Sequence, residues 1–218
     1  TVQTGTPQLS QSSYLETGGE RIAFMNRDGS GPGLVWLGGW RSDMQGSKVL
    51  HLDAVAEREG FPLLRFDYSG HGQSSGHWRD GTISKWVAES LAIFRHAAPQ
   101  TCILVGSSMG AWVTLRLAEL QKAGEGHRIK GLVLIAPAPD FAMELIEPKL
   151  TAKERGDLET QGWFEEQSDY LAEPNRWSKA FLDDGRANRV LDGIINTHCP
   201  VHILQGMKDE DVPHTHAL

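Results

Sequence analysis

The sequence lacks long apolar runs, has few cysteines and carries no excess of positive charge. Its 218 residues include two cysteines, and 21 lysines and arginines stand against 28 aspartates and glutamates, for a formal net charge of −7. No apolar run approaches the roughly 18 residues that a membrane span needs, and none resembles a signal peptide. The acidic balance argues against nucleic acid or an anionic membrane surface as the main partner. We therefore expect a protein without a membrane span or a nucleic-acid partner.

The two cysteines, Cys102 and Cys199, each stand just before or at the start of an apolar strand. In the parallel sheet predicted below, these strands are second neighbours, about 9.6 Å apart at 4.8 Å per strand. A disulfide needs Cα atoms within about 7 Å, so both cysteines are predicted to be free thiols. Such sparse cysteine use fits a reducing compartment, and we expect a cytoplasmic protein.

Apolar strands alternate with helix patterns over most of the chain. Strands are expected at residues 14–17, 21–25, 34–37, 61–66, 102–105, 131–136 and 200–204, and helices at 45–59, behind Thr82 and after Ser108. With 39% hydrophobic residues, this length predicts a single domain over residues 1–218. Continuous apolar strands between helices predict an α/β fold, with a mostly parallel sheet covered on both faces. Ligands of such sheets bind beyond the carboxyl ends of the strands.

The stretch around Ser108 combines a strand, a tight turn and a helix pattern. Four apolar residues, 102–105, run into Gly106-Ser107-Ser108-Met109-Gly110, and a largely apolar helix pattern follows at once. This order is typical of a nucleophile elbow, in which two glycines leave room for the bend and the serine stands at its tip. The helix N-terminus then directs free N–H groups at any negative charge that Ser108 creates. We predict Ser108 as the nucleophile.

A second match to Gly-x-Ser-x-Gly, at residues 72–76, tests this interpretation. A chance match is expected roughly 0.2 times in a chain with this many glycines and serines, so the bare pattern is weak. Five residues, 67–71, separate Gly72 from the strand before it, and no helix pattern follows directly. The context therefore favours Ser108 over Ser74.

Residues 140–190 interrupt the alternation between the fourth and fifth parallel strands. They are helix-prone and acidic, and their aromatic residues are Phe141, Trp163, Phe164, Tyr170, Trp177 and Phe181. A link between two parallel strands needs only one helix, so the extra length predicts a helical lid insertion over the site. The alternative is a helical excursion that packs its aromatic side chains into the core.

Several motifs together resemble the α/β-hydrolase family over nearly the whole chain. The matching stretches are Gly38-Gly39-Trp40, residues 67–74, the elbow at residues 106–110, and the loop at residues 206–213. Residues 65–70, 105–110 and 206–210 are most similar to the mitochondrial acyl-protein (palmitoyl) thioesterase and acyl-glucuronide esterase branch and its bacterial relatives. The resemblance implies an ester or thioester hydrolase that needs no cofactor or metal. In a eukaryote it would imply the mitochondrial matrix.

By the same resemblance, Ser108 is the nucleophile and Asp209 the acid that orients a histidine. The backbone N–H groups of Trp40 and Met109 would form the oxyanion hole. This division of labour is needed because a serine hydroxyl attacks only when a base takes its proton and a carboxylate holds that base. Asp67 and Asp140 also follow strands and are rival acids; Asp67 belongs to a loop that the family uses structurally.

The histidine itself is the departure from the family pattern. The base should follow the acid on a loop after one further helix and strand, but Leu218 is only nine residues beyond Asp209. His214 and His216 come too early and are predicted in the first turn of a helix behind Pro213. We therefore expect the last strand and the histidine loop to lie beyond Leu218, and no histidine within reach of Ser108.

Two functions remain open at this point. The first is a serine hydrolase acting on a small-molecule or acyl-protein ester or thioester; the second is an inactive hydrolase fold that binds small molecules. For the substrate pocket the candidates are Gly39, Arg41, Trp163 and Phe164, which would favour an apolar acyl chain. Arg41 has two candidate roles, which are pairing with a carboxylate on the leaving group or a structural salt bridge.

Overall fold

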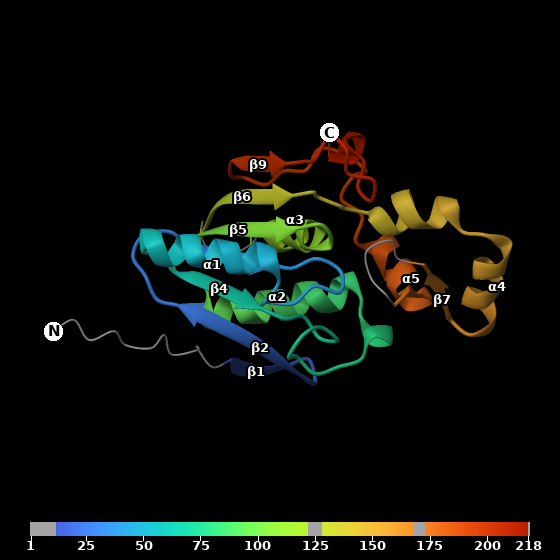
Figure 1. The fold of residues 1–218 in the computed structure, drawn as a ribbon, viewed down its shortest axis with the longest axis horizontal. Coiled ribbons are helices and arrows are strands. Elements are labelled where there is room, and N and C mark those ends of the chain that lie inside the picture. Colours follow the sequence, from blue (N-terminus) through green and yellow to red (C-terminus); the bar gives the residue numbers. More distant parts are fainter. Residues whose placement is uncertain (1–11, 122–127, 168–172, 218) are drawn as a thin grey trace.

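A seven-stranded sheet with helices on both faces organises the computed structural model (Figure 1), which describes residues 12–121, 128–167 and 173–217. The sheet begins with an antiparallel hairpin of β1 (Ser13–Thr17) and β2 (Glu20–Arg27). Its turn holds Gly18 and Gly19 at φ of 59° and 83°, a region that favours glycine because it has no Cβ. The predicted pair of short strands joined at these glycines is confirmed.

The remaining five strands of this sheet run parallel to one another. They are β3 (Gly33–Leu37), β4 (Leu63–Phe66), β5 (Cys102–Ser107), β6 (Ile129–Ile135) and β9 (Val201–Leu204). The order across the sheet is β1-β2-β4-β3-β5-β6-β9, with β2 antiparallel to β4. This confirms the predicted mostly parallel sheet. Because β5 and β9 both pair with β6, Cys102 and Cys199 start strands that are second neighbours, and both thiols are free.

Two faces of the sheet are covered by three helices, α1 (Ser47–Glu59), α2 (Ile83–Ala97) and α3 (Met109–Gln121). Trp36 and Val105 turn to one face and pack with Val49 of α1. Their strand neighbours Leu37 and Leu104 belong to the large core on the other face, which includes residues of α2 and α3. This alternation follows from the two-residue period of a strand, and it matches the predicted three-layer arrangement.

The helix ends follow from local sequence. Thr82 caps α2, since its hydroxyl oxygen accepts the Lys85 N–H at 3.2 Å, as predicted. Gly60 ends α1 in the left-handed region at φ of 74° and donates its N–H to the Ala56 carbonyl. The helices α1, α2 and α3 therefore begin within two residues of the predicted positions.

The insertion between β6 and β9 lies at the carboxyl end of the sheet (Figure 1), and its buried aromatic residues join the large core. Its elements are the short helical turns η2 (Ala142–Ile146) and η3 (Glu147–Lys149), then α4 (Ala152–Thr160), β7 (Trp163–Glu166), β8 (Asn175–Ser178) and α5 (Lys179–Ala187). The expectation of an all-helical insertion is wrong, because β7 and β8 pair as an antiparallel ribbon. Trp163 and Phe164 suit a strand, and Trp177 faces Phe164 across the ribbon. Tyr170 lies outside the described residues.

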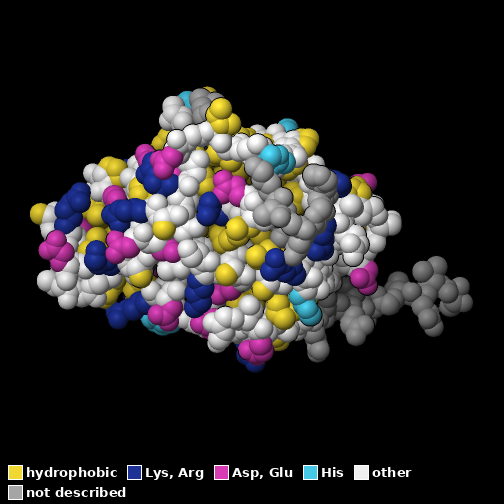
Figure 2. Space-filling model, turned by 180° about the vertical axis from the view of Figure 1, so that it is seen from behind, with side chains coloured by type: hydrophobic (Ala, Val, Ile, Leu, Met, Phe, Trp, Pro, Cys, Tyr) yellow, Lys and Arg dark blue, Asp and Glu magenta, His cyan; other side chains and the backbone are white. Residues whose placement is uncertain are grey.

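At the opposite side of the sheet from the hairpin, β9 is the outermost strand among the described residues. Its side chains Val201, Ile203 and Leu204 are 41–49% exposed. On the face turned away in Figure 1, Lys and Arg side chains are interspersed with Asp and Glu (Figure 2). Within the described part of the chain, no helix combines the length and the apolar character that crossing a bilayer would take.

Candidate active site

Ser108 stands alone between the end of β5 at Ser107 and the start of α3 at Met109. Its φ is 53°, in the left-handed region where a residue with a side chain is strained by about 1–2 kcal/mol. The bend is closed by the Ser108 N–H, which donates to the Ile135 carbonyl of β6 at 2.9 Å, and by the Ala111 N–H, which donates to the Ser108 carbonyl. The sequence-predicted strand, turn and helix are therefore present, and the Ser108 side chain stands half-buried at the tip.

The two glycines of this elbow are needed for space. A Cβ on Gly110 would overlap the carbonyl oxygens of Leu37 and Gly38, and one on Gly106 would overlap the Thr114 hydroxyl. The start of α3 thus packs directly on the end of β3. Such contact is open only to a residue without a side chain.

The loop after β3 reaches the same point from the other side. A Cβ on Gly39 would lie 3.3 Å from the Ser108 Cβ and 3.2 Å from the Ser107 carbonyl oxygen. The backbone of Gly39 and Trp40 therefore runs beside the nucleophile, while Met109, fully buried, begins the thirteen-residue helix α3. An N-terminus of this kind favours a developing negative charge near Ser108.

Ser74, the serine of the second motif, has a different environment. Its hydroxyl donates to the Asp67 carbonyl at 2.7 Å and accepts the Ala23 N–H at 2.8 Å. The first bond closes the loop of residues 67–76 on itself, and the second holds that loop onto β2. This hydroxyl stabilises a loop and does not stand free at a strand-to-helix corner.

Of the rival acids, Asp67 is buried beneath the same loop. Its carboxylate accepts the N–H groups of Met44 at 2.6 Å and Gln73 at 2.7 Å. Burial raises the pKa of Asp67, and these two backbone donors oppose that shift. Asp67 therefore joins the loops after β3 and β4.

Asp140 fastens the two ends of the insertion to each other. Fully buried and at φ of 54°, it accepts the N–H of Val190 with both carboxylate oxygens at 3.0 Å and that of Leu191 at 2.9 Å. The two ends of the segment of residues 141–189 are thus held next to each other. The hydrogen bonds of Asp140 account for its burial without a catalytic role.

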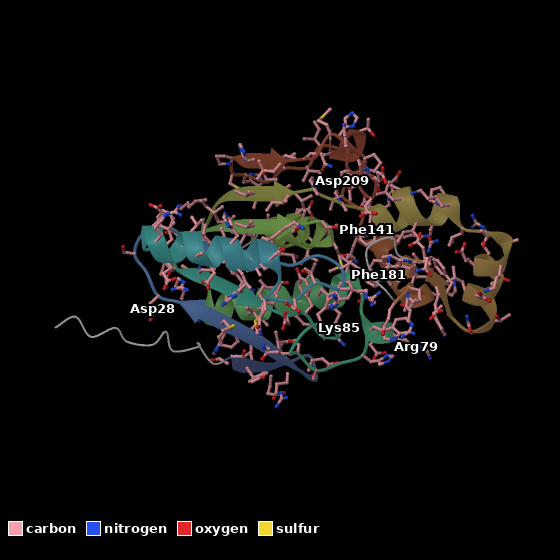
Figure 3. All side chains as sticks on the ribbon, in the orientation of Figure 1. Asp28, Arg79, Lys85, Phe141, Phe181 and Asp209 are labelled. Atoms are coloured by element: carbon pink, nitrogen blue, oxygen red, sulfur yellow. The ribbon has the colours of Figure 1, made fainter. Side chains whose placement is uncertain are left out.

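Asp209 follows β9 on the same rim as Ser108 and is half-buried; it is labelled near the top of Figure 3. The loops that carry Ser108 and Asp209 are linked through the end of β6. The Ser108 N–H donates to the Ile135 carbonyl, and the Ala136 N–H donates to the Leu204 carbonyl at 2.8 Å. One Asp209 oxygen accepts the N–H groups of Asp211 at 3.1 Å and Val212 at 2.9 Å. The carboxylate therefore also organises its own turn.

Among the described residues, no histidine ring is hydrogen-bonded to Ser108 or Asp209. His216 makes a 2.7 Å hydrogen bond with the Pro139 carbonyl from a short helical turn, His214–Ala217, which lies where a helical turn was predicted. His71 bonds the Ser69 carbonyl, and burial lowers the pKa of its imidazole. No cluster of three or more potential metal ligands occurs in the described ranges.

The side chain of Trp40 points from the loop after β3 toward the insertion. Its ring stacks on Trp177 of β8 with centroids 4.3 Å apart and contacts Phe181 of α5 at 5.1 Å. Phe141 lies within 5.7 Å of both of these rings, and Figure 3 shows Phe141 and Phe181 where the sheet meets the insertion. Aromatic residues therefore fill this junction.

The other candidate pocket residues have different positions. Phe164 is fully buried in the core, whereas Trp163 packs edge-to-face on Trp78 with Arg79 over its ring at 5.1 Å. Arg41 donates to the carbonyls of Glu173 at 3.2 Å and Pro174 at 2.8 Å and pairs with the Glu173 carboxylate at 3.7 Å. The structural salt bridge proposed as one role for Arg41 is thus present.

A cavity of about 250 Å³ adjoins Ser108 on the side of α1. It is lined by Trp36, Gly39, Trp40, Ser42, Gly46, Ser47, Lys48, Val49, Ser107 and Ser108. Trp163 and Phe164 are not among these residues. Sequence reasoning missed the contribution of Ser42 and the N-terminus of α1, although a helix that follows a rim loop in a parallel sheet must begin at that rim.

Comparison with known proteins gives concordant results. Residues 31–218 match the profile of the Alpha/beta hydrolase family. The chain is 31% identical over 193 residues to the human protein named Palmitoyl-protein thioesterase ABHD10, mitochondrial, covering 88% of this chain and 61% of that protein. This chain therefore spans about three fifths of that relative's length.

Solved structures agree. A crystal structure from Agrobacterium vitis S4 matches with a TM-score of 0.91 and 50% identity, covering 97% of this chain and 84% of that one. Mouse alpha/beta hydrolase domain-containing protein 10 matches with a TM-score of 0.83 and 29% identity over 95% of this chain and 82% of that one. The likeness therefore extends over nearly all of the fold described above.

Proposed function

This chain belongs to the alpha/beta hydrolase family, and on that premise we propose that it is a serine hydrolase of carboxylic esters or thioesters. The observation that carries the proposal is the left-handed φ of 53° at Ser108, held between β5 and the start of α3 beside Gly39. A strained backbone that exposes a hydroxyl at a helix N-terminus suits a nucleophile. The names of relatives, a palmitoyl-protein thioesterase among them, support the same reaction class.

In the proposed reaction, a histidine takes the Ser108 proton as the hydroxyl oxygen attacks the acyl carbon. The oxygen of the tetrahedral intermediate receives hydrogen bonds from the N–H groups of Trp40 and Met109. The leaving alcohol or thiol departs with the proton, and water then releases the acid from the acyl-serine. Asp209 orients the histidine, in accord with the family order of serine, acid and histidine.

We propose residues 140–190 as a lid on the single hydrolase domain. The support is that Asp140 ties Val190 and Leu191 to the start of the insertion, while Trp40 contacts Trp177 in β8 of the insertion. An insertion closed at one point and packed on the oxyanion loop is suited to govern access. The aromatic side chains favour an apolar acyl group, on a small molecule or a protein. A mitochondrial setting fits the name of the human relative, and a cytoplasmic one stays a prediction.

The test compares the two serines in the native full-length protein. A fluorophosphonate probe should label Ser108, and Ser108→Ala should abolish labelling and lower kcat/KM for p-nitrophenyl esters by about a millionfold. Ser74→Ala should retain both the labelling and the wild-type kcat/KM. Octanoyl esters should be cleaved with higher kcat/KM than acetyl esters, because the junction is aromatic.

Labelling that survives Ser108→Ala and disappears in Ser74→Ala would reverse the assignment. An intact protein that binds octanoyl esters without turning them over would instead point to the small-molecule binding module.

A further inference from the structure

The turn that carries the proposed oxyanion donor is fastened to the insertion by the side chains of two adjacent residues, of which Arg41 makes the hydrogen bonds. Gly39 to Ser42 form this turn, closed by the Ser42 N–H, which donates to the Gly39 carbonyl at 3.1 Å. Arg41, third in the turn, has a φ of 54°. Its guanidinium reaches the carbonyls of Glu173 and Pro174, just before β8, and the Glu173 carboxylate. A residue with a Cβ holds this backbone region only when its surroundings impose it.

Trp40 makes a second connection between the same two segments. Its ring stacks on Trp177, three residues after Pro174, and approaches Phe181 in α5. Adjacent residues of one turn are thus bound to one segment of the insertion, residues 173–177, the first by ring stacking and the second by hydrogen bonds. On its other side the turn contacts Ser107 and Ser108 through Gly39.

We propose that Arg41 is a positioning residue, which uses the segment before β8 as an anchor to hold the Trp40 N–H where the oxyanion forms. The proposal rests on the proposed hydrolase function and deepens it, because it makes the insertion part of the oxyanion hole. A lid bound in this way has two effects when it moves. It opens the site, and it releases the turn that carries one of the two donors.

The expected consequence is specific to the transition state. A donor stabilises the oxyanion only at about 2.7–3.1 Å, and the substrate carbonyl in the ground state depends on it much less. A misplacement of about 1 Å can cost about a hundredfold in rate. Release of the turn should therefore lower kcat and leave KM largely unchanged.

The experiment uses Arg41→Ala and Arg41→Lys in the native full-length protein, with circular dichroism to verify folding. Arg41→Ala should lower kcat about 100-fold and change KM less than about threefold. Affinity for an alkyl boronic acid, whose adduct with Ser108 mimics the tetrahedral state, should fall in parallel with kcat. Arg41→Lys retains one charged donor and should lose less, and millimolar guanidinium should restore part of the activity of Arg41→Ala.

Arg176→Ala is the matched control. Arg176 also belongs to the ribbon and is ion-paired, with Glu165 at 2.9 Å, but none of its hydrogen bonds or ion pairs involves residues 39–42. Its kcat and boronate affinity should stay within about twofold of the wild type, as expected for an exposed pair.

Two results would overturn the proposal. A higher KM with unchanged kcat in Arg41→Ala would mean that Arg41 contacts the substrate. Unchanged kcat with unchanged boronate affinity would mean that Arg41 has no part in placing the oxyanion donor. If Ser108→Ala abolishes turnover in the same preparation, such results contradict only the proposed role of Arg41 and leave the hydrolase proposal intact. If Ser108→Ala keeps full turnover, the hydrolase proposal itself fails.

Discussion

Two segments of this chain carry the same Gly-x-Ser-x-Gly pattern, and they use its residues in opposite ways. In the segment of residues 106–110, the serine takes the left-handed backbone, and the glycines allow β3, β5 and α3 to touch. In the segment of residues 72–76, the glycines take the left-handed backbone at φ of 46° and 96°. The serine between them is held by two hydrogen bonds. A pattern of residue types therefore does not define an elbow until a strand and a helix flank it.

The difference extends to what each hydroxyl can do. Ser74 donates its only hydroxyl proton to a carbonyl and accepts an N–H, so that proton is already engaged within the fold. Ser108 makes its hydrogen bonds through the backbone N–H and carbonyl, and its side chain lines a cavity. Three substitutions and one control substitution sharpen this comparison.

The largest effect is expected from Gly110→Ala. The added methyl group would overlap the carbonyl oxygens of Leu37 and Gly38, which are backbone atoms of a central strand. We expect a loss of about 3 kcal/mol in the free energy of unfolding, measured by urea denaturation, together with loss of fluorophosphonate labelling.

Gly156→Ala is the control for Gly110→Ala. Gly156 lies within α4, where an added Cβ meets nothing within 4 Å. This substitution should raise stability by about 0.5–1 kcal/mol, because alanine is the better helix former. Equal effects of the two substitutions would show that close packing at the elbow is not what Gly110 provides.

Ser74→Ala should have an intermediate effect, on stability alone. The substitution leaves the Ala23 N–H and the Asp67 carbonyl without the hydroxyl that joins them. We expect a loss of about 2 kcal/mol in the free energy of unfolding. The measurement is urea denaturation alongside ester turnover. A stable variant with impaired turnover would place Ser74 in the chemistry and erase the contrast between the two motifs.

The smallest effect concerns pH and Glu89, which supports the loop of the second motif. Glu89 is 3% exposed and accepts the Ser69 N–H at 2.9 Å. Burial raises the pKa of this carboxyl group, against the opposing effects of that hydrogen bond and of Lys85, while the charge of Glu20 adds to the increase. The folded state therefore holds the proton more tightly than the unfolded chain does. The stability contributed by Glu89 is present below its ordinary pKa and is lost as pH rises through the raised value.

Glu89→Gln tests this, because glutamine can still accept the Ser69 N–H but does not ionise. The wild type minus variant difference in free energy of unfolding should fall by about 1 kcal/mol between about pH 4 and pH 7. A difference that rises over this range would mean that the folded state prefers the ionised carboxylate. Thermal or urea unfolding at both pH values provides the measurement.

Much of the fold could be predicted because its signals are local. The strand before Ser108, the cap at Thr82 and the glycine stop at Gly60 each depend on a few neighbouring residues, and each is present. The ribbon of β7 and β8 was not predicted, because nine residues or more separate paired positions such as Glu166 and Asn175. Pairing of that kind depends on tertiary packing more than on local preference.

The sequence by itself determined which serine stands at a strand-to-helix corner, since strand, glycine turn and helix are consecutive along the chain. It also determined the rim on which Asp209 lies, because parallel strands end on one edge. Only the tertiary structure decided which partners the charged side chains bind. Asp140 clamps residues that lie fifty positions away, and Arg41 binds carbonyls more than 130 positions away. Such partners leave no periodic signal in the chain, because they meet only when separate segments are packed together.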